Sequence, residues 1–376
     1  MKKVLIIGGG FAGCCAAHVL MGQGFDITVV ERGSFLGGGV KTHWYGGHPY
    51  TYGPRHFLTY DENLFAFLNQ YVPMRRMTSE HENYTYVERD HQFYSWPPHQ
   101  DDIGRMPDSD TIRDELKNLS PIANVNNFEE MWLGSVGPTL YSKYAESYSK
   151  KMWQVDSNAL LDGVEFAAEG QLIGPLARLR SGPRAPWANT GIISAFPIAP
   201  NGYDDYFLLA TREANVLLNT QVEAFDVENY RAKLAGEWQT YDVIISTISP
   251  EILMNGIYGK LRWMGREFWK IVLPVEQVFP DNVIFLYYAN AEPFTRIVEY
   301  KKFYLNKSPS TLLGLEIPST RNQLYPFPAR QDQERAQQYL SAMPEKVFSI
   351  GRMGTYRYID IDDTIAQCLD LKKKLA

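Results

Sequence analysis

A glycine-rich turn between an apolar run and a predicted helix constrains the fold of this chain more than any other feature. Val4–Ile7 is entirely apolar, as a buried parallel strand should be, and Gly8-Gly9-Gly10-Phe11-Ala12-Gly13 follows it. We expect a helix over Cys14–Gln23 that a glycine closes, and a second strand over Asp26–Val30 that leads into an acidic residue. This pattern predicts one strand–helix–strand unit of a Rossmann-like sheet.

The spacing of Gly8, Gly10 and Gly13 is typical of a dinucleotide-binding turn. The first glycine allows a tight turn, the second lets the backbone approach a pyrophosphate, and the third lets helix and strand pack closely. Phe11 and Ala12 lie where the helix N-terminus offers unpaired N–H groups to phosphate. Glu31 can accept hydrogen bonds from both ribose hydroxyls, and its charge disfavours a 2′-phosphate. The turn therefore predicts a dinucleotide cofactor.

Three further features favour FAD over NAD. Arg32 and the pair Gly37-Gly38 follow the acidic residue and resemble the second glycine turn of flavoprotein oxidoreductases. The strand pattern of Asp242–Thr247 resembles their second flavin-side strand. Gly351-Arg352-Met353-Gly354, between a strand and the last helix, resembles their C-terminal flavin loop. Because these features span the chain, we expect an FAD-binding protein.

Composition argues against several other classes of protein. The chain has 37 Lys and Arg against 43 Asp and Glu, a net charge of −6 that argues against non-specific nucleic-acid binding. Three cysteines, Cys14, Cys15 and Cys368, support neither a disulfide framework nor a metal site. The first apolar run is too short for a signal peptide, and no stretch approaches the roughly 18 apolar residues of a membrane span. We therefore expect a cytoplasmic protein.

Five segments, in order along the chain, form a second pattern: Tyr52-Gly53-Pro54, Tyr148-Ser149-Lys150-Lys151-Met152-Trp153, 292–301, Leu324-Tyr325-Pro326 and 351–360. Each resembles a motif of the UDP-galactopyranose mutase family, with Ser147 in place of the glycine that opens the second motif. The resemblance implies an isomerase, a flavin-dependent mutase that interconverts the pyranose and furanose forms of a nucleotide-diphosphate sugar. In this chemistry N5 of reduced flavin attacks the anomeric carbon and displaces the nucleotide.

The resemblance also implies an α/β architecture, with a Rossmann-like FAD-binding domain, an inserted helical domain and an antiparallel β-sheet domain. Helical patterns over 108–161 and strand patterns over 270–317 agree with this division. The expected ranges are 1-75, 203-250 and 330-376 for the FAD-binding domain, 99-165 for the helical domain, and 76-98, 166-202 and 251-329 for the sheet domain that binds substrate.

The resemblance implies a substrate such as UDP-galactopyranose, UDP-N-acetylgalactosamine or dTDP-fucose. It implies FAD that is active when reduced, with an external reductant such as NAD(P)H. No nucleic-acid partner is expected, and the helical domain could mediate a homodimer.

Four residues match family positions that contact the diphosphate or the flavin. Arg296 corresponds to the family's fixed diphosphate arginine, whose planar fork suits phosphate oxygens. Arg352 corresponds to an arginine at the flavin edge, although a salt bridge with Asp360 is an alternative role. Tyr325 and Tyr358 match two tyrosines whose hydroxyls donate to the diphosphate, and Tyr358 is also expected near the cofactor.

Further candidates come from the helical and proline-rich segments. By the resemblance, Trp153 would flank the sugar and Tyr148 would lie near the nucleotide base. The family also closes a mobile loop over the diphosphate with an arginine. Here the proline-rich stretch 175–202 holds Arg178, Arg180 and Arg184, of which the second or third is the preferred candidate.

The sequence departs from the family where its loop motif GPHiFHT carries two histidines. Arg55 replaces the first histidine and Leu58 the second, while His56 lies one position away and does not restore the register. This loop borders the flavin and the sugar, so the replacements leave the sugar open. An apolar Leu58 favours a deoxy position or an N-acyl methyl, and Arg55 favours an additional anion or acceptor.

Two other functions stay open at this point. An FAD-dependent amine oxidase or desaturase shares the expected fold, but Arg296, Arg352 and the two tyrosines favour a diphosphate ligand. A non-catalytic nucleotide-sugar-binding relative is consistent with the missing histidines.

Overall fold

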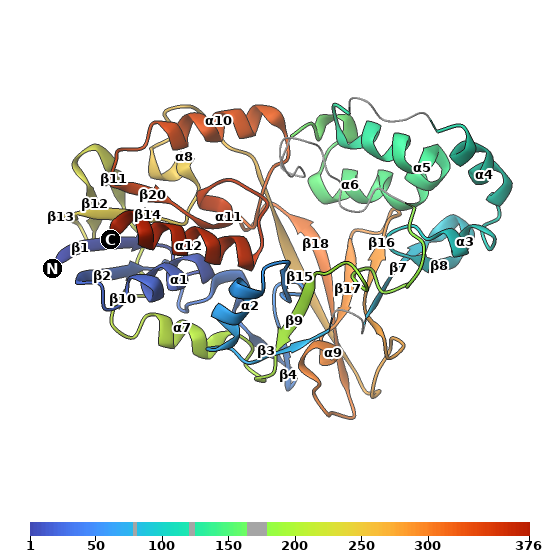
Figure 1. Cartoon of the computed structure of the whole chain (residues 1–376), viewed down its shortest axis with the longest axis horizontal. Coiled ribbons are helices and arrows are strands. Elements are labelled where there is room, and N and C mark those ends of the chain that lie inside the picture. Colours follow the sequence, from blue (N-terminus) through green and yellow to red (C-terminus); the bar gives the residue numbers. More distant parts are fainter. Residues whose placement is uncertain (78–80, 120–124, 164–178) are drawn as a thin grey trace.

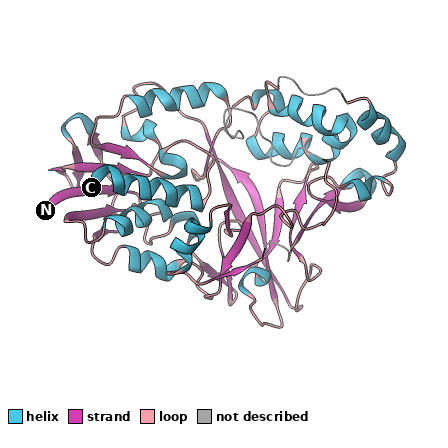
Figure 2. Ribbon diagram, viewed as in Figure 1, coloured by secondary structure: helices cyan, strands magenta, loops and turns pink. Residues whose placement is uncertain are grey.

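The computed structural model describes residues 1–77, 81–119, 125–163 and 179–376. Figure 1 shows an elongated molecule in which both chain ends lie in the part formed by the parallel sheet and its flanking helices, a large sheet crosses the middle, and a group of helices forms the other end. Figure 2 shows that helices cover the parallel sheet, whereas the large sheet spans the middle of the molecule. Within the described ranges, no helix is long and apolar enough to cross a membrane.

The parallel sheet has the strand order β10-β2-β1-β14-β20, and every neighbouring pair is parallel. Its strands are β1 (Lys2–Ile7), β2 (Phe25–Val30), β10 (Asn215–Leu217), β14 (Val243–Ser246) and β20 (Val347–Ser349). Alternate side chains of the central strand enter two separate cores, because Val4 and Ile6 face one side of the sheet and Leu5 and Ile7 the other. The Rossmann-like prediction is confirmed.

The first helix lies three residues earlier than predicted at both ends. Helix α1 (Phe11–Leu20) begins directly after Gly10, whose backbone is extended, and Met21 leaves the helix. Gly22 follows with a φ of 71°, so the turn begins before the glycine at which we expected the helix to end. The predicted range Cys14–Gln23 was therefore wrong at its boundaries, while the helix itself is confirmed.

Helices from the middle and the end of the chain pack around α1. These are α7 (Asp204–Ala210) and α12 (Ile361–Leu375), with α2 (Glu62–Asn69) on α12. Cys14, Cys15 and Cys368 are buried and free within this core, and the Cys368 thiol donates to the carbonyl oxygen of Ala12 at 3.6 Å. The last helix therefore lies directly against the glycine turn.

A seven-stranded sheet fills the middle of the molecule in the order β19-β15-β18-β17-β16-β7-β8. All neighbouring pairs are antiparallel except β16 and β7, which are parallel. The strands are β7 (Glu82–Val87), β8 (Gln92–Ser95), β15 (Trp263–Leu273), β16 (Val283–Tyr288), β17 (Arg296–Glu299), β18 (Thr311–Ser319) and β19 (Tyr325–Pro326). The strand patterns over 270–317 are thus confirmed.

One row of directly opposite residues crosses six strands of this sheet. Because opposite partners share a face, their side chains project to the same side. The row is Phe268, Glu316, Arg296, Tyr287, Thr85 and Tyr94. We call these six residues the substrate row.

Four helices lie beside the substrate row: α3 (Gln100–Ile103), α4 (Ser109–Lys117), α5 (Phe128–Tyr144) and α6 (Glu146–Trp153). The Asn127 side chain accepts a hydrogen bond from the Glu130 N–H, so it caps α5. Trp96 joins these helices to the sheet, because its ring lies 5.9 Å from Tyr144 and 4.7 Å from Tyr287.

Smaller elements connect the two ends of the molecule. Strand β9 (Ile193–Pro197) lies between β5 (Phe57–Thr59) and β6 (Met74–Arg76), so the proline-rich stretch leads back to the core. The remaining strands are β3 (His43–Tyr45), β4 (His48–Tyr50), β11 (Ala224–Asp226), β12 (Arg231–Leu234) and β13 (Glu237–Thr240). The remaining helices are α8 (Pro250–Leu253), α9 (Lys301–Tyr304), α10 (Arg330–Ser341), α11 (Gly351–Gly354) and the short η1 (Gly38–Val40), η2 (Glu88–Asp90), η3 (Asn158–Leu160) and η5 (Val227–Asn229). The domain boundaries given above stay a prediction.

Candidate active site

The three fingerprint glycines meet different constraints. A Cβ atom on Gly8, where φ is +99°, would lie 2.2 Å from Thr247 Oγ1, and one on Gly13 would lie 1.9 Å from the Gly8 carbonyl oxygen. A Cβ atom on Gly10 would meet no atom within 4 Å. Protein packing therefore requires the first and third glycines, whereas the second borders open space, as close approach of a pyrophosphate would need.

Two distant loops close on this turn. The Gly37 N–H donates to the Gly9 carbonyl oxygen at 2.7 Å, and a Cβ atom on Gly38 would lie 3.2 Å from the Gly10 Cα. A Cβ atom on Gly351, where φ is +75°, would lie 2.7 Å from the Ala12 Cβ. The predicted second glycine turn and the predicted C-terminal loop therefore both contact the start of α1.

Glu31 lies at the end of β2, where its carboxylate organises the backbone. One oxygen accepts from the Gly9 N–H at 2.8 Å and the other from the Gly33 N–H at 2.7 Å. Each oxygen keeps a second lone pair for a hydroxyl donor. Arg32 is exposed beside it. The role of both residues toward a ribose or cofactor stays a prediction.

A cavity of about 230 Å³ opens where these segments meet. Its lining residues come from the glycine turn, the η1 loop, the loop after β4, the end of β14 and the C-terminal segment: Gly10, Phe11, Ala12, Gly39, Val40, Pro54, Arg55, His56, Thr247, Gln323, Leu324, Gly351, Arg352, Met353, Ile359, Asp360, Ile361 and Thr364. Free N–H groups at the start of α1 and the open space at Gly10 fit a dinucleotide such as FAD.

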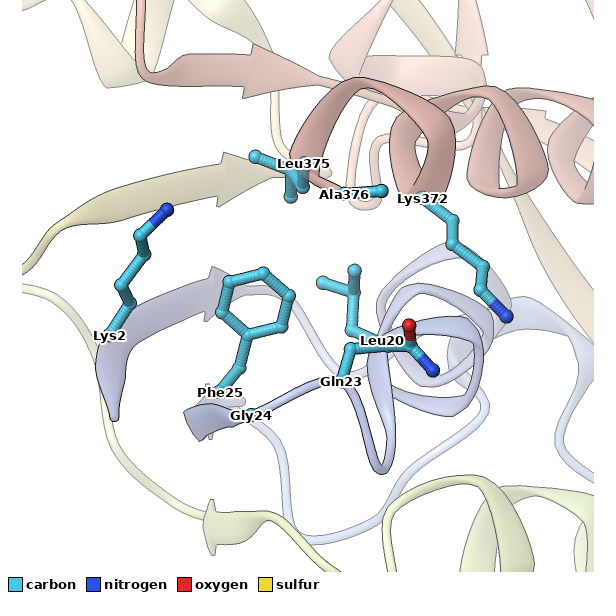
Figure 3. A pocket seen from close by; sticks show the side chains of 8 residues that line it. All are labelled: Lys2, Leu20, Gln23, Gly24, Phe25, Lys372, Leu375 and Ala376. Atoms are coloured by element: carbon cyan, nitrogen blue, oxygen red, sulfur yellow. The ribbon is translucent and has the colours of Figure 1, made fainter.

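A second cavity, of about 240 Å³, lies at the opposite edge of the parallel sheet. In Figure 3 the side chains of Leu20 and Phe25 lie between α1 and the end of α12, with Lys2 and Lys372 at the rim. This edge carries the first residues of β1 and β2, whereas ligands of open parallel sheets bind beyond the carboxyl ends of the strands. The first cavity is therefore the candidate cofactor site.

Arg352 joins the flavin-side cavity to a pair of tyrosines. Its Nε donates to the Ile359 carbonyl oxygen at 2.7 Å and its Nη2 to Asp360 Oδ1 at 2.9 Å, so the salt bridge considered as its alternative role is present. Its guanidinium carbon also lies 4.8 Å from the ring centre of Tyr325 and 5.1 Å from that of Tyr358. The two rings stack with centres 5.3 Å apart.

The Tyr325 hydroxyl lies in a strongly positive environment. Burial alone would raise its pKa, but the guanidiniums of Arg55, Arg352 and Arg266 lower the pKa of Tyr325 to about 8. For Tyr358, burial and the neighbouring Tyr325 phenol raise the pKa to about 12. The Tyr325 hydroxyl is therefore a strong hydrogen-bond donor below pH 8.

Arg266 on β15 is a site residue that sequence reasoning missed. It is 3% exposed, its Nη1 donates to the Gly265 carbonyl oxygen at 2.7 Å, and its Nη2 contacts the sulfur of Met152. Its guanidinium carbon lies 5.0 Å from the Tyr325 ring centre. In the sequence, only the alternation of side chains along a strand could have indicated this role. Arg266 lies two residues before Phe268, so its side chain is on the face of the substrate row.

Arg296 is fixed by a carboxylate. Its Nε and Nη2 donate to the two oxygens of Glu316 at 2.9 and 2.8 Å, and the Glu316 side chain is only 2% exposed. The guanidinium carbon lies 5.7 Å from the ring centre of Tyr287, its neighbour in the substrate row. Arg296 also hydrogen-bonds the Tyr287 side chain, so two neighbours in the substrate row hold the guanidinium group.

The charges around Tyr325 do not cancel within the described residues. Arg296 pairs with Glu316, and Arg352 with Asp360. Neither Arg55 nor Arg266 has a carboxylate partner in the part of the chain that the structure describes, and Arg55 Nε is buried with no hydrogen bond there. Four guanidiniums against two carboxylates leave two positive charges in excess. Such a cluster favours a dianionic ligand.

The two aromatic candidates on α6 have different ring contacts, although both pack in or against the hydrophobic cluster that contains Tyr325. The Tyr148 ring lies 5.8 Å from Trp96 and 5.9 Å from Tyr287, next to the substrate row. Trp153 is 4% exposed and packs edge-on against Phe327, in the core cluster that contains Tyr325. Their predicted contacts with base and sugar stay predictions.

The loop with the replaced histidines reaches the cavity through Arg55 and His56. The His56 ring lies 5.4 Å from Trp187 and 5.9 Å from Phe303, and neither of its nitrogens has a hydrogen-bond partner among the described residues. Burial lowers the pKa of His56 well below its usual range, so the ring is neutral. Leu58 lies on β5 opposite Ser194.

The two described loop arginines are half-exposed and make contacts with other parts of the protein. The Arg180 guanidinium donates to the carbonyl oxygens of Pro183, Arg184 and Ala185 at 3.1–3.2 Å. Arg184 pairs with the buried Asp102 at 2.9 Å. Arg178 lies outside the described residues. A role for either described arginine over a diphosphate stays a prediction, and it would require these contacts to open.

Comparison with known proteins assigns the chain to a family. The family model for UDP-galactopyranose mutase matches residues 143–358, and one for an NAD(P)-binding Rossmann-like domain matches residues 6–71. A probable UDP-galactopyranose mutase of Klebsiella pneumoniae is 25% identical over 98% of this chain and 93% of its own. A dTDP-fucopyranose mutase of Escherichia coli is 23% identical over 98% of this chain and 97% of its own. The crystal structure of a reduced UDP-galactopyranose mutase superposes with a TM-score of 0.81 at 18% identity, over 100% of this chain and 95% of its own. The chain belongs to the UDP-galactopyranose mutase family.

Proposed function

We propose that this protein is an FAD-dependent isomerase that interconverts the pyranose and furanose forms of a nucleotide-diphosphate sugar. One observation carries the proposal: two positive charges in excess, with the hydroxyls of Tyr325 and Tyr358, lie beside the cavity that borders the glycine turn. A diphosphate supplies two negative charges and several acceptor oxygens, so it satisfies both the charges and the donors.

The diphosphate would be held from two sides. Arg352 and the stacked tyrosines lie on the side of the FAD cavity, and Arg296 lies on the substrate row. Because Glu316 and Tyr287 both hydrogen-bond Arg296, its guanidinium group is oriented before substrate arrives, which lowers the entropy lost on binding. Arg266 supplies charge from beneath Tyr325.

FAD, when bound and reduced, supplies the nucleophile of the reaction, and we propose that an external reductant such as NAD(P)H maintains it. The chain's own residues have other tasks. The N-terminus of α1 and Gly10 would hold the pyrophosphate of FAD, and Gly38 and Gly351 close the loops around it. Arg352, at the rim of this cavity, adds positive charge beside the cofactor.

Binding at the two ends of the substrate differs. Tyr148, beside Trp96 and Tyr287, offers aromatic surface for a base. Arg55 and His56 line the cavity where the sugar would meet the flavin, and both keep unsatisfied ring or guanidinium nitrogens. We propose that these nitrogens bind sugar oxygens. Relatives act on UDP-galactopyranose and on dTDP-fucopyranose by their names, so the candidate substrates are these two and UDP-N-acetylgalactosamine.

The test is a panel of these three nucleotide sugars with dithionite-reduced protein, read by chromatographic separation of pyranose and furanose forms. We expect furanose product from at least one substrate and none from oxidised protein. No product from any substrate would contradict the proposal. Tight UDP binding without turnover would then select a binding protein, and hydrogen peroxide released from amines would select an oxidase.

A further inference from the structure

The ammonium group of Lys151 on α6 lies inside a ring of backbone carbonyl groups. Its Nζ donates to the carbonyl oxygens of Tyr288, Asn290, Glu292 and Phe294 at 3.0, 3.1, 2.8 and 2.8 Å. These are alternate residues of the connection from β16 to β17, which curls around the ammonium group. We call these four oxygens the carbonyl ring.

The carbonyl ring has the chemistry of a monovalent cation site. An ammonium group has three N–H donors, so the four carbonyl oxygens at hydrogen-bonding distance must share them. Part of the attraction between Lys151 and the ring is therefore that of a positive charge for carbonyl dipoles. Protein sites for K⁺ use the same ligand type, carbonyl oxygens that replace the hydration shell. Burial lowers the pKa of Lys151 to about 8 although Glu292 opposes the change, which shows how far the group is removed from water.

This ring joins two parts of the candidate active site. The carbonyl group of Phe294 lies two residues before Arg296, and the Thr295 N–H and hydroxyl both donate to the Glu316 carbonyl oxygen, at 2.9 and 3.2 Å. On the other side, Lys151 lies between Tyr148 and Trp153 on one short helix. The ammonium group therefore connects α6 directly to the segment that begins the Arg296 strand.

We propose that Lys151 is a positioning residue for substrate binding: its ammonium group occupies a built-in monovalent cation site and holds α6 against the strand that carries Arg296. The ligand-binding part of this inference rests on the proposed function, because the Arg296 fork is taken to bind the diphosphate. Lys151 itself does not touch the substrate.

The chain offers three informative variants. Lys151→Ala removes the ammonium group and leaves space for a small cation. Lys151→Met fills most of the volume but carries no charge. Lys150→Ala is the matched control, because Lys150 lies on the same helix and its ammonium group pairs with Glu146 at 2.9 Å, one turn away and apart from the carbonyl ring. Each variant is purified with FAD, and UDP binding to the oxidised protein is measured by calorimetry at constant ionic strength.

We expect both Lys151 variants to bind UDP about tenfold or more weakly than wild type, in line with the loss of hydrogen bonds from a charged donor. Lys150→Ala should bind like wild type. Ammonium or K⁺ should restore most of the affinity of Lys151→Ala, whereas Li⁺ should not. The same two cations should raise the melting temperature of Lys151→Ala and leave those of wild type and Lys151→Met unchanged.

Wild-type affinity in Lys151→Met would overturn the proposal, because side-chain volume alone would then account for the position. Equal responses of Lys151→Ala to ammonium and Li⁺ would also overturn it. If Lys151→Ala does not fold, Lys151→Met still decides between charge and volume. If wild type binds no UDP, the proposed function fails, while the cation-specific melting of Lys151→Ala still tests the carbonyl ring.

Discussion

The glycine turn at residues 8–13 and the substrate row are assembled in different ways. The turn takes its shape mostly from backbone atoms, such as the carbonyl oxygen of Gly8 against Gly13, and from the contact of Gly8 with Thr247. The row takes six side chains from six strands between residues 85 and 316, and each is placed by strand register. The turn therefore tolerates no added atom at Gly8 or Gly13, whereas the row depends on the pairing of Arg296 with Glu316. Substitutions can test this difference.

The largest effect is expected for Arg296→Ala. It leaves the buried Glu316 carboxylate unpaired, which should destabilise the protein by about 3–5 kcal/mol and abolish UDP binding. Chemical denaturation and calorimetry measure the two losses. The double variant Arg296→Met with Glu316→Leu should recover most of the stability but none of the binding. A double variant as unstable as Arg296→Ala would show that packing, and not charge matching, governs the row.

Gly13→Ala should have the next largest effect. Its Cβ would meet the Gly8 carbonyl oxygen at 1.9 Å, so helix and strand must separate, at about 1–3 kcal/mol. The purified protein should contain little FAD by absorbance. Gly10→Ala is the matched control: its Cβ meets no protein atom, so the apoprotein should keep its stability within ~0.5 kcal/mol and lose only FAD affinity. Equal destabilisation by both would remove the distinction between the two glycines.

The variant Arg266→Met tests whether the charge of Arg266, and not only its side-chain volume, is needed at the substrate face. Because Arg266 is buried without a carboxylate partner among the described residues, its removal should leave the ligand-free protein as stable as wild type or more so. UDP affinity should fall by about tenfold to a hundredfold, about 1.5–3 kcal/mol, and depend less on salt. Melting temperatures with and without UDP measure both effects. Unchanged affinity would mean that the excess charge does not bind the diphosphate.

The smallest expected effect is a dependence on pH. With the pKa of Tyr325 lowered to about 8, its hydroxyl donates below that pH and is an anion above it, where it repels a diphosphate. UDP affinity should therefore be full near pH 7 and fall about tenfold per pH unit above 8, as the competent fraction falls. In Tyr325→Phe affinity should be lower at pH 7 and should fall less steeply above pH 8. A fall of the same size in Tyr325→Phe would assign it to another group, such as Lys151, whose pKa is also lowered to about 8.

The parts that sequence predicted are those set by local patterns. The strand before the glycine turn and the acidic residue after β2 each depend on neighbours in sequence, and both were predicted correctly. The predicted ends of α1 were wrong for two reasons. Gly10, which precedes the helix, has no side chain that could indicate an N-cap. The predicted last residue lay beyond Gly22, where the backbone already turns with a positive φ.

The rest of the site depends on contacts that no short segment contains. Arg266 was missed because only the register of β15 on β18 and β19 brings it beneath Tyr325. The carbonyl ring around Lys151 was also missed, since its ligands are backbone atoms that any sequence supplies. Motif resemblance selected Tyr325, Arg352 and Tyr358 as separate candidates, and the structure brings these three together.

The order of strands in the parallel sheet has a consequence for how the protein is made. β1 and β2 leave the ribosome first, but β20 and the segment from Gly351 to Thr364 that lines the FAD cavity follow more than 300 residues later. At ~5–20 residues per second this delay is roughly 20–70 s. Until β14 is synthesised, one edge of the central strand β1 has no hydrogen-bonded neighbour. Until the 351–364 segment is synthesised, the FAD cavity lacks part of its lining. Cofactor loading should therefore follow completion of the chain, and scarcity of FAD during translation should not by itself prevent folding of the glycine turn.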